Sequence, residues 1–314
     1  MSLKSVILLV FSTVLACAGI IPAQPPASNQ VVRTVTIPIS ILSDKDSRAG
    51  QSEEFVQAET LTVREAGDEQ QILSIRSVSD SPLSIALLIQ DDLASGFNLQ
   101  IPDIQKFIRS LPKGTRVMTA YSRSGSVQIR QRFTDDLEAA AKSLRIVVGS
   151  PAVSPRSPYQ GVSDMIGRFD AVPTGRRALL LFSDGLDTSE GVSLASISQS
   201  FDLGQALLKA QRKGVAVYSF YSPTITAEGN STFAFAGQGA LNKLSEETGG
   251  RAFFQGTLAP ISFEPFFRDL VVALNRQFAL TYLSTHMKKG YYKVKVESTN
   301  PAVRVDHPKG YYYR

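Results

Sequence analysis

Carboxylates stand at the ends of two apolar segments of the chain. Asp91 and Asp92 follow residues 83–89 (LSIALLI), and Asp184 stands near the end of residues 176–185 (RRALLLFSDG). Continuous apolar runs bounded by turn residues are typical of strands that are buried on both faces of a parallel sheet. Because ligands bind at the carboxyl ends of such strands, we expect these carboxylates to converge at one rim of a sheet.

Further oxygen-bearing side chains are predicted to reach the same rim. Asp187 lies three positions beyond Asp184, and Ser157 lies in a loop before a helix that begins near Tyr159. Carboxylates, hydroxyls and water are the ligands that a hard cation such as Mg²⁺ prefers. The sequence therefore predicts a candidate metal site at this rim.

The chain lacks the usual motifs of an enzyme. Its two histidines, His286 and His307, both lie in the C-terminal segment, away from the rim, and the sequence contains neither GxSxG nor HExxH. Nucleophilic catalysis normally needs an activated nucleophile beside a base. We therefore expect no enzymatic activity. The alternative is a metal-dependent hydrolase in which two Asp carboxylates act as an acid and base pair.

Apolar strands alternate with amphipathic helices between residues 80 and 256. This alternation predicts an α/β fold with a doubly wound, mostly parallel sheet covered on both faces. Gly237 and Gly239 are interpreted as the start of a helix over 240–250. The expected strands cover 83–89, 116–122, 126–133, 176–185, 215–221 and 251–254, and the other expected helices cover 103–111, 134–144, 159–169 and 202–214.

The two ends of the mature chain have a different pattern. Residues 31–41 alternate between apolar and polar side chains, as do residues 290–298, and alternation with period two predicts half-buried strands. We expect residues 31–79 to pack with residues 257–314, a helix followed by strands, as one smaller β module built from both termini. The α/β domain, residues 80–256, is then inserted between its halves.

The N-terminus has the form of a secretory signal peptide. Lys4 precedes an apolar run from Val6 to Ala18 that is too short for a membrane span. Cleavage after Ala23 would give a signal peptide of residues 1–23 and a leader of residues 24–30, and the small residues around Cys17 offer a second cleavage position. In a third reading Cys17 itself carries a lipid anchor. Each reading predicts export to the periplasm, the cell envelope or the medium, and no later segment is apolar enough to be a transmembrane segment.

The order of these pieces resembles a von Willebrand factor A (VWA) domain. The chain resembles most closely the secreted bacterial proteins called VWFA-related, which are common in Acidobacteria. The matching pieces are LTVREAGDEQQI, SPLSIALLIQDD, FSDGLDTSEG, LSEETGGRAFF and the tail from LNRQFALTYLS to the final tyrosines, so the resemblance spans about residues 31–314. It implies a central, mostly parallel sheet between helices.

The family's metal site, called MIDAS, has the motif Asp-x-Ser-x-Ser, a later Thr and a final Asp. Asp184 matches the final Asp and Ser157 stands for the Thr. The first element does not match, whether Gln90 or Asp91 is placed at the leading Asp. The resemblance thus implies a degenerate MIDAS, at which an altered site could still bind Mg²⁺ or Mn²⁺ through Asp91, Asp92, Ser95, Ser157 and Asp184, with Asp187 behind them. The alternative is that Asp92 and Ser95 cap the following turn or helix.

These observations favour a secreted or envelope-associated protein that binds a protein partner through the rim, in adhesion or assembly. The formal net charge is only +5, and no run of Lys and Arg is dense enough to predict binding to nucleic acid. In an intact site of the family, the metal takes an acidic side chain of the partner. The alternative function is a structural envelope component that binds through its β module.

Overall fold

The computed structural model describes residues 31–43, 60–78, 81–123, 126–149, 157–189, 191 and 200–313. The signal peptide, the leader and the lipid anchor predicted at Cys17 lie outside these residues. Residues 32–314 form one compact unit. In the described part of the chain, no helix is long and apolar enough to cross a membrane.

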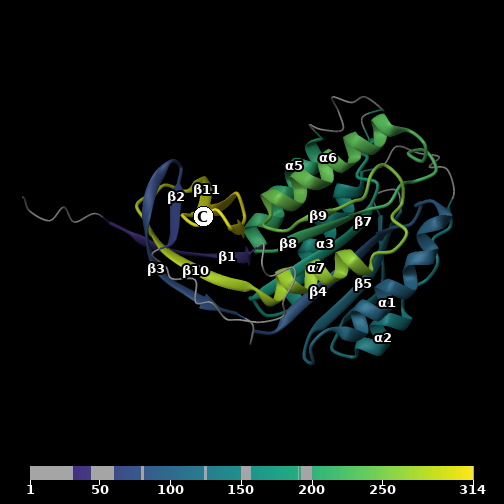
Figure 1. Cartoon of the computed structure of the whole chain (residues 1–314), viewed down its shortest axis with the longest axis horizontal. Coiled ribbons are helices and arrows are strands. Elements are labelled where there is room, and N and C mark those ends of the chain that lie inside the picture. Colours follow the sequence, from purple (N-terminus) through teal and green to yellow (C-terminus); the bar gives the residue numbers. More distant parts are fainter. Residues whose placement is uncertain are drawn as a thin grey trace, which may run out of the picture. The chain divides into compact units, whose positions relative to one another are not determined.

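A six-stranded, mostly parallel sheet confirms the predicted α/β fold (Figure 1). Four of its five strand pairings run parallel, and only β6 is antiparallel to its neighbour β5. The strands β4 and β7 are buried along their whole length, because helices cover both faces. The strand order is β6 (Ser126–Thr134), β5 (Arg116–Arg123), β4 (Leu83–Gln90), β7 (Arg176–Ser183), β8 (Ala216–Tyr221) and β9 (Ala252–Phe253).

Alternate residues of the strands belong to two separate hydrophobic cores, one on each face of the sheet. In β4, Ile85 and Leu87 belong to the core on one face, whereas Ala86 and Leu88 belong to the core on the other. The helices on the first face are η2 (Ser95–Gln100), α1 (Ile101–Ser110), α2 (Leu137–Lys142) and α7 (Glu264–Asn275), and those on the second are α3 (Pro158–Arg168) with η3 (Phe169–Ala171), α5 (Phe201–Lys213) and α6 (Ser231–Glu247). Figure 1 shows α5 and α6 on one side of the sheet and α1, α2 and α7 on the other.

The position of α7 corrects the expected domain boundary at residue 256. We expected this helix to pack with the β module, but its apolar face packs mainly on the parallel sheet. Phe267 lies 5.1 Å from Phe220 and Phe263 lies 5.6 Å from Phe182, measured between ring centroids. Aromatic rings bury a large area, so these contacts fix α7 in the core of the α/β domain. The amphipathic pattern predicted a buried face but could not identify the sheet that buries it.

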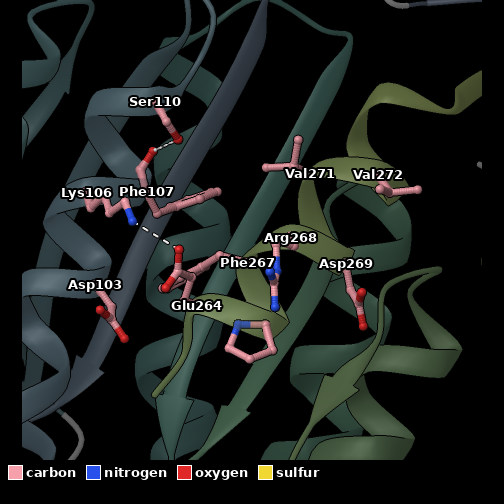
Figure 2. Close-up of a pocket in the computed structure, with 11 residues that line it drawn as sticks. Asp103, Lys106, Phe107, Ser110, Glu264, Phe267, Arg268, Asp269, Val271 and Val272 are labelled. Carbon is pink, nitrogen blue, oxygen red and sulfur yellow. Dashed lines mark hydrogen bonds and ion pairs between the residues drawn. The ribbon is translucent and has the colours of Figure 1, made fainter. Parts of the chain in front are cut away.

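A groove of about 740 Å³ runs between α1 and α7 (Figure 2). Phe107 and Phe267 stack in its floor, with 4.5 Å between their ring centroids. Lys106 pairs with Glu264 across it at 3.0 Å, and the Asp103 carboxylate accepts a hydrogen bond from the Phe263 amide just before α7. Since these side chains contact one another, the groove is explained by the docking of α7 on α1.

The second sheet is antiparallel and contains strands from both ends of the chain, as expected. The long strand β1 pairs with β10 from Arg33 opposite Ser284 to Ser40 opposite Gln277. The alternating residues Val35, Ile37 and Ile39 face the core of this sheet. The strand order is β12 (Val303–Asp306), β1 (Arg33–Ser43), β10 (Gln277–Ser284), β3 (Asp68–Ser77), β2 (Leu61–Glu65), β11 (Gly290–Ser298) and β13 (Gly310–Tyr313).

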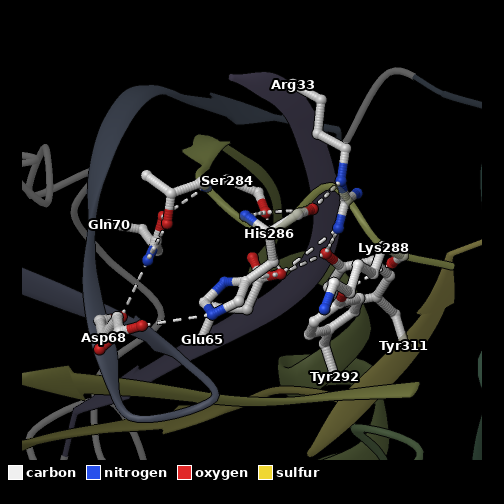
Figure 3. Close-up of polar contacts among 10 residues, drawn as sticks. Arg33, Glu65, Asp68, Gln70, Ser284, His286, Lys288, Tyr292 and Tyr311 are labelled. Carbon is white, nitrogen blue, oxygen red and sulfur yellow. Dashed lines mark hydrogen bonds and ion pairs between the residues drawn. The ribbon is translucent and has the colours of Figure 1, made fainter. Parts of the chain in front are cut away.

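A buried carboxylate joins the two halves of this β module (Figure 3). Glu65 is fully buried, and its Oε1 accepts hydrogen bonds from the hydroxyls of Ser284, at 2.9 Å, and Tyr311, at 2.7 Å. Arg33, from β1, and His286 lie 3.4 and 3.5 Å from the same oxygen. Burial is the main cause that raises the pKa of Tyr311 to about 12. The cluster thus places His286 in the β module, where it contacts Glu65.

Candidate functional site

The carboxyl ends of β4 and β7 meet at the point where the strand order of the parallel sheet reverses. The chain passes from β4 to β5 on one side and later returns to β7 on the other side of β4. In open α/β sheets this switch point is the usual position of a binding site. Gln90 ends β4 and Ser183 ends β7, so the predicted rim residues follow directly on both sides.

Gln90 bridges the two strand ends. Only 2% of it is exposed. Its Nε2 donates to Asp92 Oδ1 at 3.0 Å, and its Oε1 accepts from the Ser183 hydroxyl at 2.6 Å and from the Asp184 amide at 3.3 Å. The neutral amide offers a donor to the carboxylate of Asp92 and an acceptor to the facing loop at the same time, which an ionised carboxylate in its place could not do. The sequence identified Gln90 as a mismatch to the family motif but did not predict this bridge.

Asp91 is held by an arginine that the sequence did not identify. Arg145 donates from Nη1 to Asp91 Oδ1 at 2.7 Å and from Nη2 to Oδ2 at 2.9 Å. The guanidinium also lies over the ring of Tyr121, 4.2 Å from its centroid. The hydrogen bond to Asp91 is the main cause that raises the pKa of Arg145. Both Asp91 oxygens are therefore engaged by an internal cation, in the bidentate geometry that arginine favours.

Asp184 is fully buried beneath α6. Its Oδ1 accepts from the Leu186 amide at 3.0 Å, and its Oδ2 accepts from the Thr224 hydroxyl, beyond β8, at 2.7 Å. A Cβ atom placed on Gly237 would lie 1.9 Å from the Asp184 carbonyl oxygen. Gly237 lies in the middle of α6, not at a helix start, and this corrects our interpretation of that segment. The glycine is required because the helix backbone approaches the β7 loop so closely.

Ser157 and Asp187 meet, as expected, but in contact with further hydroxyls. Asp187 Oδ2 accepts from the hydroxyls of Ser157, at 2.8 Å, and Ser200. Its Oδ1 accepts from both the amide, at 3.0 Å, and the hydroxyl, at 2.6 Å, of Ser189. The carboxylate is thus saturated by donors. The buried hydroxyl of Tyr159 donates a hydrogen bond to the Gly185 carbonyl at 2.7 Å. Burial is the main cause that raises the pKa of Tyr159, and the charges of Asp184 and Asp187 raise it further.

Ser95 does not join these residues. It is exposed and is the first residue of η2, which begins without a side-chain cap. The alternative prediction that Asp92 and Ser95 cap the next helix is therefore wrong for η2. The Asp92 carboxylate accepts a hydrogen bond from Gln90.

The side chains at the rim do not fit a divalent cation. Asp91, Asp184 and Asp187 accept hydrogen bonds with both of their oxygens, and Gln90 is neutral. In the ranges that the structure describes, no group of three or more His, Cys, Asp or Glu side chains could hold a metal ion. A cation would have to displace donors that already satisfy these oxygens.

Exposed apolar side chains lie beside this closed cluster. Leu99 is 79% exposed and Ile261 is 97% exposed, and Ile146 and Val148 are also exposed. Two amides bring them together: Asn98 donates to the Val147 carbonyl at 3.1 Å and accepts from its amide at 2.8 Å, and Gln100 donates to the Ile261 carbonyl at 2.9 Å. We call Leu99, Ile146, Val148 and Ile261 the apolar rim patch.

Comparisons with known proteins return remote structural similarities. No family model and no curated protein matches the chain. A von Willebrand factor type A structure from Catenulispora acidiphila is 9% identical, with 83% of this chain and 75% of that chain covered and a TM-score of 0.45. An aerotolerance-related membrane protein from Bacteroides fragilis is 12% identical, with 62% and 98% covered and a TM-score of 0.42.

Another similar structure is proximal thread matrix protein 1 from the mussel byssus, which has a zinc-occupied MIDAS motif. It is 11% identical, with 68% of this chain and 50% of that chain covered and a TM-score of 0.39. All three TM-scores lie below 0.5. The fold described above therefore rests on the strand order and the helix packing of this chain.

Proposed function

We propose that the chain is an exported, non-catalytic protein of the VWA type that binds a protein partner through the apolar rim patch and without a metal ion. Membership of the secreted bacterial VWFA-related proteins, a degenerate MIDAS and a role in adhesion or assembly are parts of this proposal. The observation that carries it is the bridge made by Gln90, which supplies a neutral hydrogen-bond donor to Asp92 at the position that one of the two registers of the resemblance gives to a metal-binding carboxylate.

The saturated carboxylates support binding without a metal ion. A bridging cation contributes to partner binding only if protein oxygens are left to hold it. In this protein, Arg145 and Gln90 supply positive charge and donors to Asp91 and Asp92 from within the chain. A general base must also be able to accept a proton from a substrate. The engagement of both oxygens of Asp91 and of Asp184 therefore also supports a non-catalytic role.

The apolar rim patch supports contact with a protein. Contiguous exposed apolar surface on a soluble domain usually marks an interaction site. Burying one Leu or Ile side chain contributes about 1.5–3 kcal/mol. Leu99 and Ile261 are the most exposed members and have the largest area to bury on binding. The backbone at Ile261 is held by hydrogen bonds from the Gln100 side chain to the carbonyls of Pro260 and Ile261, so little ordering of this segment is needed on binding.

The proposal is tested by comparing two variants of the full mature chain as baits for partner capture from the cells that produce it. Leu99→Asp combined with Ile261→Asp is expected to abolish capture of the partner, whereas Leu73→Asp, at an exposed position of β3, is the matched control and should keep it. Capture by the wild type should be unchanged by EDTA. Loss of capture in EDTA, or equal capture by the rim variant, would overturn the proposal.

A further inference from the structure

A basic pocket lies on the β module. It has a volume of about 590 Å³ and is lined by residues of β2, β11, the segment before β13 and the end of α6. Four of these side chains are cationic: Arg64, Lys293, Lys295 and Lys309. Tyr291 lies beside them, and Glu247 is the single carboxylate in the lining.

Strand pairing forces these cations together. Arg64 on β2 stands directly opposite Lys295 on β11, and Lys293 is two residues farther along β11. Residues that face each other across an antiparallel pair have Cβ atoms about 4.5–5.5 Å apart, and like charges in this position destabilise the sheet. Lys309 is next in sequence to Gly310, which pairs with Lys293. The arrangement therefore costs stability unless opposite charge is nearby.

The chain supplies part of that opposite charge, since Arg64 also stands opposite Glu69 on β3 and Glu297 lies near enough to interact with it electrostatically. Lys295 pairs with Glu297 at 2.6 Å. Among the residues that the structure describes, no carboxylate forms an ion pair with Arg64, Lys293 or Lys309. In the lining of the pocket itself, four cations face one carboxylate, so an excess of positive charge remains. The alternation of β11 explains the position of its lysines: Val294 and Val296 are buried in the core, whereas Lys293 and Lys295 alternate with them and face outward.

We propose that this basic pocket binds an extended acidic segment of a protein, with carboxylates at alternate positions. Side chains at positions i and i+2 of a strand point to the same face, with a rise of about 3.3 Å per residue. Lys293 and Lys295 therefore present charges about 7 Å apart, the spacing of alternate carboxylates in an extended peptide. Arg64 offers a planar guanidinium, which binds carboxylates in bidentate geometry. This inference is independent of the apolar rim patch, which lies on η2 and on the segments that follow α2 and precede α7.

The test measures the fluorescence anisotropy of two labelled peptides with the full mature chain at low salt. One peptide alternates Glu with Thr, and the other has the same composition with the Glu residues grouped at one end. We expect saturable binding of the alternating peptide, at least several-fold tighter than that of the grouped one. Binding should weaken as salt is raised, because exposed charges are screened.

Two double variants separate a site from general attraction by net charge. Lys293→Gln with Lys295→Gln should weaken binding about tenfold, since each exposed ion pair contributes a fraction of a kcal/mol to about 1 kcal/mol. Arg76→Gln with Lys113→Gln removes the same charge at exposed positions outside the pocket and should change binding less than twofold. Equal losses in both variants, or equal binding of both peptides, would overturn the proposal.

A second anion class is tested in the same assay. Inorganic polyphosphate is added as a competitor, and the proposal expects it to displace the alternating peptide only weakly. If polyphosphate binds through Lys293 and Lys295 while the peptide does not bind, the pocket recognises phosphate and the acidic-peptide assignment is wrong. Thermal unfolding of the control variant should match the wild type within about 1 °C, because exposed substitutions change stability little. The Lys293, Lys295 variant should unfold at the same or a slightly higher temperature, because it relieves repulsion between like charges.

Discussion

Replacing Gln90 by glutamate is expected to destabilise the protein strongly at neutral pH. The substitution keeps the shape of the side chain but replaces the Nε2 donor, 3.0 Å from Asp92 Oδ1, by an oxygen. Two unit charges 4 Å apart interact by about 4 kcal/mol at an effective dielectric constant of 20. We therefore expect Gln90→Glu to lower the free energy of unfolding by about 4 kcal/mol, a large share of the ~5–15 kcal/mol typical of a domain.

The loss should depend on pH in a defined direction. Burial and the neighbouring Asp92 raise the folded-state pKa of the introduced carboxyl above the unfolded value of about 4.3. Below that value the carboxyl is protonated in both states and the repulsion is absent. As pH rises through the folded-state pKa, the repulsion appears in full. Gln90→Glu should therefore be closer to the wild type at pH 5 than at pH 7.

Urea unfolding followed by far-ultraviolet circular dichroism measures this difference, since the chain has no Trp to report by fluorescence. Gln128→Glu, at an exposed position of β6, is the matched control and should change stability by less than about 0.5 kcal/mol. Millimolar Mg²⁺ should recover part of the loss in Gln90→Glu and leave the wild type unchanged. A Gln90→Glu protein within about 1 kcal/mol of the wild type at pH 7 would refute the role of Gln90 as a neutral bridge.

Three further substitutions test the packing of α6 and the acid sensitivity of the β module. Gly237→Ala should lower the thermal unfolding temperature and cost about 3 kcal/mol of stability, because its Cβ would lie 1.9 Å from the Asp184 carbonyl oxygen. Gly239→Ala, which has open space on the same helix, should instead stabilise the protein by about 0.5–1 kcal/mol. Equal effects of the two substitutions in calorimetry would contradict this packing. Burial, followed by the charge of Lys309, lowers the pKa of His307 to about 4, so the stability that this group contributes is complete above pH ~6.5 and is lost as pH falls toward 4. His307→Gln should remove about 2–3 kcal/mol of that acid sensitivity in urea titrations between pH 7 and 4, and an unchanged pH profile would show that His307 is not the group responsible.

The sequence predicted the parts of the fold that depend on local pattern. Residues 83–89 read as a strand buried on both faces because they are continuously apolar, and β4 is buried throughout. The alternation in residues 31–41 likewise predicted β1 and its place in a module built from both ends of the chain. Packing between distant elements was harder. The apolar face of α7 fits either sheet, and only the ring contacts of Phe263 and Phe267 decide between them.

In the candidate site, too, local pattern predicted the positions of residues along the chain but not the contacts between distant residues. Strand ends brought Asp91, Asp92 and Asp184 to one rim, but the partner that engages Asp91 lies 54 residues away in sequence at Arg145. No spacing rule predicts such a pair. The sequence analysis also did not predict that the backbone of α6 packs against the Asp184 carbonyl. A glycine inside a helical pattern often marks such a close approach of two backbones. Gly237 is the signal that could have revealed it.

The pairing of β1 with β10 has a consequence for the order in which the protein is made. β10 lies between β1 and β3, yet it begins at Gln277, whereas β1 ends at Ser43. A ribosome that adds ~5–20 residues per second leaves roughly 10–50 s between the two strands. All strands of the parallel sheet precede β10 in the chain, so the α/β domain can form before β10 is present, while β1 and β3 still have unpaired edges. Such edges are templates for aggregation, and the antiparallel sheet is therefore the step at which a chaperone has most to protect.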